Sequence, residues 1–138
     1  ESISSEYEGT ESEILSNYYL GKIAYEMANF DKAKLFLNSF LDNAENAKLV
    51  CGAIKHLVDI SFQENDYTES LKILEKAKKF NISGVSYLEL KLLEINTFIK
   101  INDLQKAKVE VGKIAKNKNL PAYIKQNIDE LEGVIQAL

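Results

Sequence analysis

The side chains best suited to chemistry are few in this chain and stand apart from one another. His56 is the only histidine and Cys51 the only cysteine of the 138 residues, so these residue types cannot supply the ligand set of a zinc site. Asp59 and Glu64 could act as acid or base, but they lie among lysines on one helical stretch, where solvated ion pairs are the ordinary arrangement. The sequence therefore predicts no catalytic residue, no cofactor and no metal.

The charge balance gives no reason to expect a nucleic-acid partner. The chain has 21 acidic and 17 basic residues, and its formal net charge is -4. Five of the acids fall within the first 13 residues, so the rest is close to neutral, whereas binding a phosphate backbone needs a basic surface. No stretch approaches the roughly 20 apolar residues of a membrane-spanning helix. We expect neither a nucleic-acid partner nor a membrane span in this chain.

A short phrase that recurs at a fixed spacing indicates how the chain folds. Asn-Phe-Asp-Lys-Ala, Asp-Tyr-Thr-Glu-Ser and Asp-Leu-Gln-Lys-Ala end on Ala33, Ser70 and Ala107, which are 37 residues apart. A period of roughly 20 to 50 residues is typical of stacked repeats. Apolar residues recur at helical spacing and do not alternate. The pattern predicts an all-α protein of about seven helices.

Turn and cap residues divide the chain into three helical hairpins and a closing helix. The first ten residues are rich in Glu, Ser and Gly, so we expect residues 1–10 to be disordered or frayed. The domain is expected over 11–138, with repeats at about 11–44, 46–80 and 84–117 and a capping helix over 121–138. The helices of the second copy are expected over 47–64 and 67–80.

Several residues are predicted to start these helices. Ser, Thr, Asp and Asn are favoured at this position because their side chains accept a hydrogen bond from an unpaired amide of the first turn. The predicted caps are Thr10 with Glu13, then Asp31, Asp66 and Ser83, and Pro121 is expected in the first turn of the closing helix.

The first copy resembles a tetratricopeptide repeat. Leu20 and Gly21 form a Leu-Gly pair, followed by the aromatic Phe30 in the turn and by Ala33, at the spacing of that family. The other two copies keep the small residue of the phrase but lack the Leu-Gly pair, and the period is longer than the family's usual 34. The resemblance implies a right-handed α-solenoid of three hairpins plus a capping helix, with the small residues where the two helices of a hairpin cross.

The same resemblance implies that the first helix of each hairpin lines a concave groove that binds a protein or peptide. Register with the family places Leu15, Glu26, Gln63, Glu89 and Ile99 there, together with the eight residues predicted to bind a partner: Tyr18, Lys22, Tyr25, Lys55, Asp59, Phe62, Leu92 and Asn96. Rigid aromatic side chains are favoured at binding hot spots. The alternative for Tyr18, Tyr25 and Phe62 is that they fill the core between repeats. The family's clamp for terminal carboxylates is not expected, because Glu89 and Leu93 stand where further basic residues would be needed.

The closing helix, which begins Leu-Pro-Ala-Tyr-Ile-Lys, adds a looser resemblance. It is similar to that of the repeat domain of bacterial inner-membrane proteins associated with the secretion translocon. That resemblance implies the periplasmic face of the inner membrane; without it, the cytoplasm is expected.

We therefore expect a non-catalytic scaffold that binds another protein, with two alternatives. One is a homodimer formed through the first or last helix, and the other is an accessory domain of a larger enzyme.

Overall fold

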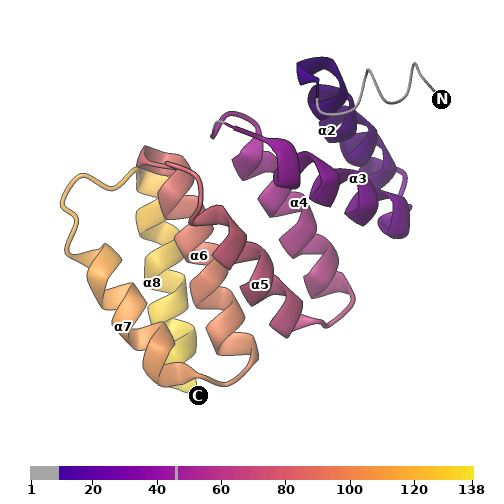
Figure 1. Cartoon of the computed structure of the whole chain (residues 1–138). Helices are drawn as coiled ribbons and strands as arrows, with labels where there is room; N and C mark the ends of the chain where they lie inside the picture. The colour runs from indigo at the N-terminus through magenta and orange to yellow at the C-terminus, as the bar shows by residue number, and fades with distance from the viewer. Residues whose placement is uncertain (1–9, 46) are drawn as a thin grey trace.

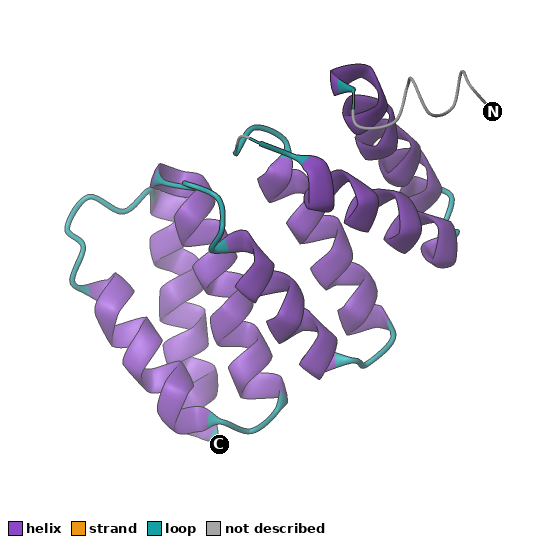
Figure 2. Ribbon diagram, in the orientation of Figure 1, coloured by secondary structure: helices purple, strands orange, loops and turns teal. Residues whose placement is uncertain are grey.

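The chain folds as a row of helices. The computed structural model describes residues 10–45 and 47–138, and in these residues every regular element is a helix, with no strand (Figure 1 and Figure 2). The seven helices are α2 (Glu11–Glu26), α3 (Phe30–Asn43), α4 (Val50–Gln63), α5 (Tyr67–Ala77), α6 (Gly84–Lys100), α7 (Leu104–Ala115) and α8 (Ala122–Ala137). The prediction of an all-α protein of about seven helices is confirmed.

The first described residue starts the first helix. The Thr10 side chain accepts a hydrogen bond from the Glu13 amide at 3.2 Å, so the predicted cap is confirmed. The rest of the predicted disordered segment, residues 1–9, lies outside the described residues. So does position 46, the predicted start of the second repeat.

The turns inside the three hairpins share one geometry. A residue with positive φ precedes each second helix: Ala28 (φ 59), Asn65 (φ 56) and Asn102 (φ 63). The next residue caps the helix, since the side chains of Asn29, Asp66 and Asp103 accept from the amide three positions on. The prediction of Asp66 is confirmed. The prediction that Asp31 caps the second helix was wrong, because Asn29 already occupies that position and Asp31 lies in the first turn.

Other predicted helix ends shift for local reasons. Helix α4 starts at Val50 and not at residue 47, because Leu49 has a left-handed backbone (φ 70) that no α-helix includes. Helix α5 ends at Ala77 and not at residue 80, because the next three amides bond to carbonyls only three residues back. Ser83 is the N-cap residue of α6, as predicted, but its side chain makes no cap hydrogen bond, and Pro121 is the N-cap residue of α8 and lies outside its first turn.

Consecutive helices pack against one another along the chain. Figure 1 shows them in chain order, from α2 and α3 at one end to α7 and α8 at the other. The helices of each hairpin are in contact, and so are α3 with α4, α5 with α6 and α7 with α8. The first helices also contact each other, α2 with α4, α4 with α6 and α6 with α8. This second set of contacts brings α4, α6 and α8 together on one face.

Small residues allow close packing within the hairpins. Ala33, Ser70 and Ala107, one on each second helix, are completely buried. Gly21 on α2 faces Leu37 on α3, and a Cβ added at Gly21 would lie 2.6 Å from Leu37 Cγ and Cδ2. The two helices of the first hairpin are therefore too close to admit a side chain at this point.

Candidate docking groove

A groove of about 430 Å³ runs over α4, α6 and α8. Its lining residues lie one helical turn apart on each helix: Lys55, Val58, Asp59 and Phe62 on α4, Glu89, Leu92, Leu93 and Asn96 on α6, and Tyr123 and Asn127 on α8. Five of the eight residues predicted to bind a partner line this groove, namely Lys55, Asp59, Phe62, Leu92 and Asn96. The structure thus brings together the predicted residues of the second and third hairpins.

The predicted residues of the first hairpin lie elsewhere. Tyr18 is only 7% exposed and packs its ring against Phe40 at a centroid distance of 5.2 Å. Its hydroxyl approaches Gly52 on α4, where an added Cβ would lie 2.9 Å away. Tyr18 therefore fills the core between the first two hairpins, which is the alternative considered for the aromatic residues. Lys22 is half-buried on α2 and is not among the lining residues of the groove.

Tyr25 joins α2 to α4 and orders one end of the groove. Its hydroxyl donates a hydrogen bond to Asp59 Oδ2 at 2.5 Å, and Gln63 Nε2 donates to the same oxygen at 2.8 Å. The Tyr25 ring stacks on His56 at a centroid distance of 4.2 Å. Asp59 is thereby held by two donors, which fix the orientation of its carboxylate.

The surroundings of His56 favour the neutral form of its imidazole. Burial lowers the pKa of the imidazole, and the positive charge of Lys22 lowers it further, against the opposing charges of Glu26 and Asp59. Its contact is the Tyr25 ring, so its evident role is packing. Within the described part of the chain, no group of three or more His, Cys, Asp and Glu side chains could hold a metal ion.

Lys55 bridges α4 and α6 across the groove floor. Its ammonium lies 2.8 Å from Glu89 Oε1, and both side chains are partly buried. Burial lowers the pKa of Lys55, but the hydrogen bond and charge of Glu89 outweigh it, so the pKa lies above its ordinary value. The ammonium is therefore charged and already paired, and a terminal carboxylate of a ligand would have to compete with Glu89.

Two amides in the groove have no polar partner. The side chains of Asn96 on α6 and Asn127 on α8 make no hydrogen bond within residues 10–45 and 47–138. Each side-chain amide has two N–H donors and one carbonyl oxygen acceptor. Such groups, set beside the rings of Phe62 and Tyr123, can bond to the backbone of a polypeptide while the rings and Leu92 provide apolar contact.

The contribution of α8 was missed from the sequence. Helix α8 was expected only to cap the row, yet Tyr123 and Asn127 complete the groove wall. A signal was present: Tyr123 and Asn127 lie 34 residues after Glu89 and Leu93, just as Glu89 and Leu93 lie 34 residues after Lys55 and Asp59.

Comparisons with known proteins add no relative. No protein-family model matches the chain, and no significant match is found with curated proteins or with solved structures. Over the residues described, no helix combines the length and the hydropathy needed to cross a bilayer.

Proposed function

We propose that this chain is a tetratricopeptide-like repeat domain, a right-handed α-solenoid that binds a segment of another protein in the groove over α4, α6 and α8. The repeat part of the proposal is supported by the recurring turns, whose caps Asn29, Asp66 and Asp103 are 37 residues apart. It is also supported by the contacts that link α2, α4, α6 and α8 in series. The domain acts as a scaffold without catalysis.

The single observation that carries the binding role is the groove itself. It combines apolar and aromatic side chains with the unpartnered amides of Asn96 and Asn127 on adjacent helices. Burying unpaired amides costs free energy unless a partner bonds to them, so the groove is suited to an occupant with backbone donors and acceptors.

An internal segment suits the groove better than a chain terminus. The one groove ammonium, that of Lys55, is neutralised by Glu89 at 2.8 Å, and Asp59 adds a negative charge. A terminal carboxylate would meet a groove with no free cation. The backbone of an extended or helical segment carries no net charge and meets no such penalty.

Selection from a displayed random-peptide library tests this proposal. Peptides selected on the wild-type chain should bind about tenfold more weakly to the Asn96→Ala/Asn127→Ala double variant, because two hydrogen bonds of about 0.5–1.5 kcal/mol each are lost. Neither amide has a partner among residues 10–45 and 47–138, so the variant should keep its stability. The matched control is Asn81→Ala, an exposed amide in the loop before α6. Equal binding to all three proteins would contradict the proposal.

A homodimer through the first helix is the second candidate, favoured by one feature of α2. Leu20, Ile23 and Met27 form a stripe along this helix and are 46%, 52% and 76% exposed. Contiguous exposed apolar residues are typical of association surfaces. Sedimentation equilibrium would show a dimer that Ile23→Glu dissociates and Val109→Glu, at an exposed apolar position on α7, does not. A monomer at all concentrations would eliminate this candidate.

A further inference from the structure

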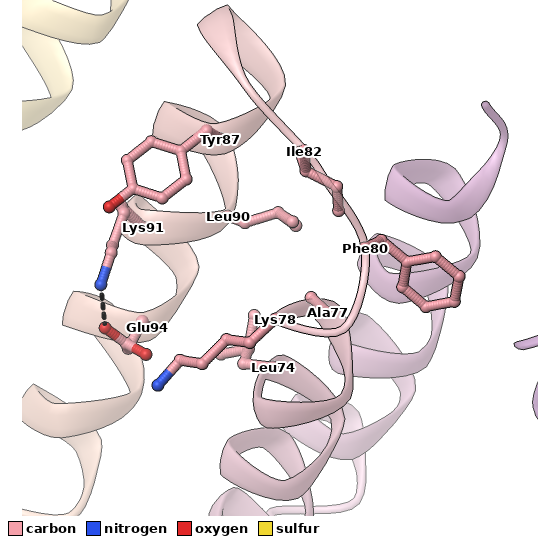
Figure 3. Close-up of a pocket in the computed structure, with 9 residues that line it drawn as sticks. All are labelled: Leu74, Ala77, Lys78, Phe80, Ile82, Tyr87, Leu90, Lys91 and Glu94. Carbon is pink, nitrogen blue, oxygen red and sulfur yellow. Dashed lines mark hydrogen bonds and ion pairs between the residues drawn. The ribbon is translucent and has the colours of Figure 1, made fainter. Parts of the chain in front are cut away.

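A second hollow of about 310 Å³ lies between the end of α5 and the first half of α6 (Figure 3). Its walls are Leu74, Ala77 and Lys78 on α5, Phe80 and Ile82 in the loop, and Tyr87, Leu90, Lys91 and Glu94 on α6. We call it the α5/α6 pocket. On α6, each residue that lines the groove lies two positions after one that lines the pocket. Two positions correspond to a rotation of roughly 200° around the helix axis. The pocket and the groove therefore lie on opposite sides of α6.

One residue that lines the pocket is small where both neighbouring repeats carry a large residue. Ala77 is related by 37 residues to Phe40 before it and to Ile114 after it. Phe40 is 3% exposed and packs against the Tyr18 ring on α2, and Ile114 is 6% exposed at the end of α7. Both large side chains are buried, whereas Ala77, 8% exposed, contributes only a methyl group to the lining of the pocket.

The wall contributed by α6 departs from its neighbours in the same way. The residues of α4 and α8 that correspond to Lys91 are Ile54 and Ile128, and those that correspond to Glu94 are Leu57 and Leu131. All four are apolar and are buried or half-buried. Tyr87, 47% exposed, stands where the other two helices have the fully buried Val50 and Ile124. Ala77, Tyr87, Lys91 and Glu94 thus all differ from the large or buried apolar residues at the corresponding positions of the two neighbouring repeats.

The charged wall is formed by a partly buried ion network. Lys91 Nζ lies 3.0 Å from Glu94 Oε1 and 3.4 Å from Glu110 Oε2, and these side chains are only 21%, 13% and 17% exposed. A partly buried ion network is typically no more stable than the apolar residues that could replace it. Departures from local packing rules concentrate at functional sites. The altered positions surround one pocket, so we treat them as a binding site.

We propose that the α5/α6 pocket binds an aromatic side chain presented by another polypeptide, beside Ala77, the position at which the first repeat has its own aromatic residue, Phe40. Leu74, Ala77 and Leu90 provide the apolar floor for the ring. The Lys91–Glu94 pair at the rim offers a donor and an acceptor to the backbone beside it (Figure 3). This inference uses the 37-residue register of the proposed repeat but does not need the groove to be occupied.

A polypeptide is favoured over a free small molecule because the mouth of the pocket is open. Tyr87 at the rim is 47% exposed, and the Lys78 side chain is 58% exposed. Free ligands are typically bound with roughly 70–90% of their surface covered. A side chain that enters from a larger segment adds contacts at the rim and needs less enclosure.

Titrations followed by nuclear magnetic resonance test the inference with the tripeptide N-acetyl-Gly-Phe-Gly amide. We expect saturable shifts at Leu74, Ala77 and Leu90, none with N-acetyl-Gly-Gly-Gly amide, and several-fold weaker binding of toluene. No saturable shift, or shifts at Leu92 and Asn96 only, would overturn the inference and leave the groove proposal standing. Toluene binding as tightly as the tripeptide would overturn the assignment to a polypeptide.

Filling the pocket provides the matched control. Ala77→Phe should raise the melting temperature, because the ring enters space that is already open, and should abolish the tripeptide shifts. Ala77→Ile, the residue type of Ile114, is the second filling variant if the first does not fold. The same Phe introduced at the fully buried Ala33 should lower the melting temperature. Tripeptide shifts that persist in a folded filling variant would contradict the assignment of the site.

Discussion

The Tyr25 hydroxyl donates a hydrogen bond to Asp59 Oδ2 at 2.5 Å, and the two residues are 34 positions apart on neighbouring first helices. Lys55 and Glu89, which pair at 2.8 Å between α4 and α6, are separated by the same 34 positions. The small residues buried in the hairpins are 37 apart. These two polar contacts therefore join residues of successive first helices that are 34 positions apart. This separation is shorter than the 37-residue repeat by about one helical turn.

The Tyr25 bond predicts a stability change at alkaline pH. The hydrogen bond to Asp59, then burial and the Asp59 charge, raise the pKa of Tyr25 from 10.0 to about 12. Because the folded pKa exceeds the unfolded one, this contribution is complete below pH 10 and is lost as the pH rises through 12. The free energy of unfolding should fall more steeply over this range in the wild type than in Tyr25→Phe. Parallel curves for the two proteins would refute the assignment, as would a tyrosinate absorbance titration without a late-titrating group.

Gly21 should not tolerate a side chain. In Gly21→Ala the new methyl group would meet Leu37 Cγ at 2.6 Å and the Leu37 backbone nitrogen at 3.2 Å. Overpacking of this kind costs on the order of 1–3 kcal/mol, which outweighs the gain of about 0.5–1 kcal/mol from replacing a helical glycine. Gly112→Ala on α7, with no atom within 4 Å of the new methyl group, should be stabilised by that gain. Chemical denaturation of both variants measures the difference, and a stabilised Gly21→Ala would disprove the close approach.

The Ser70→Ala variant should be more stable than the wild type. Its side-chain oxygen is buried and has no hydrogen-bond partner in the described structure, while Ala33 and Ala107 occupy the corresponding positions. Removing an unsatisfied buried hydroxyl is expected to raise the free energy of unfolding by about 1 kcal/mol. Ser61, whose hydroxyl donates to the Leu57 carbonyl at 3.1 Å, is the control and should gain nothing as alanine. Urea titration would contradict the account if Ser70→Ala were the less stable variant.

Replacing Ala28 by glycine should stabilise the fold. It adopts φ 59 in the first turn, where the later turns have Asn65 and Asn102. The left-handed region costs an alanine roughly 1–2 kcal/mol, and glycine avoids this cost. Ala28 is exposed, so its methyl group contributes little packing. The melting temperature of Ala28→Gly should rise, and a fall would show that the strain in this turn is compensated elsewhere.

The helices could be predicted because their signals are local. A capping side chain such as Asp66 acts on an amide three residues away, and this short range makes it readable from the sequence. The prediction that Asp31 caps α3 was wrong. Asn29, which is also a favoured capping residue type, lies two positions earlier, and only the backbone geometry distinguishes the two.

The lining of the candidate groove could be predicted where it depends on one face of a helix, and could not be predicted where packing between helices decides which side chains are buried. Asn96 and Phe62 could be placed by their spacing along α6 and α4. Tyr18 could not, because its burial depends on the absence of a side chain at Gly52 on another helix. The α5/α6 pocket was missed for the same reason, since the effect of Ala77 depends on what α6 places opposite it.

Site-specific photo-crosslinking tests the central claim most directly. A photoreactive phenylalanine derivative at Asn127, an exposed residue that lines the groove, should form a covalent adduct with a distinct partner polypeptide in the cells that make this protein. The same derivative at Lys108, exposed on α7 and outside the groove, should give none. Adducts from Lys108 as strong as those from Asn127, or none from Asn127, would contradict a docking role for the face formed by α4, α6 and α8.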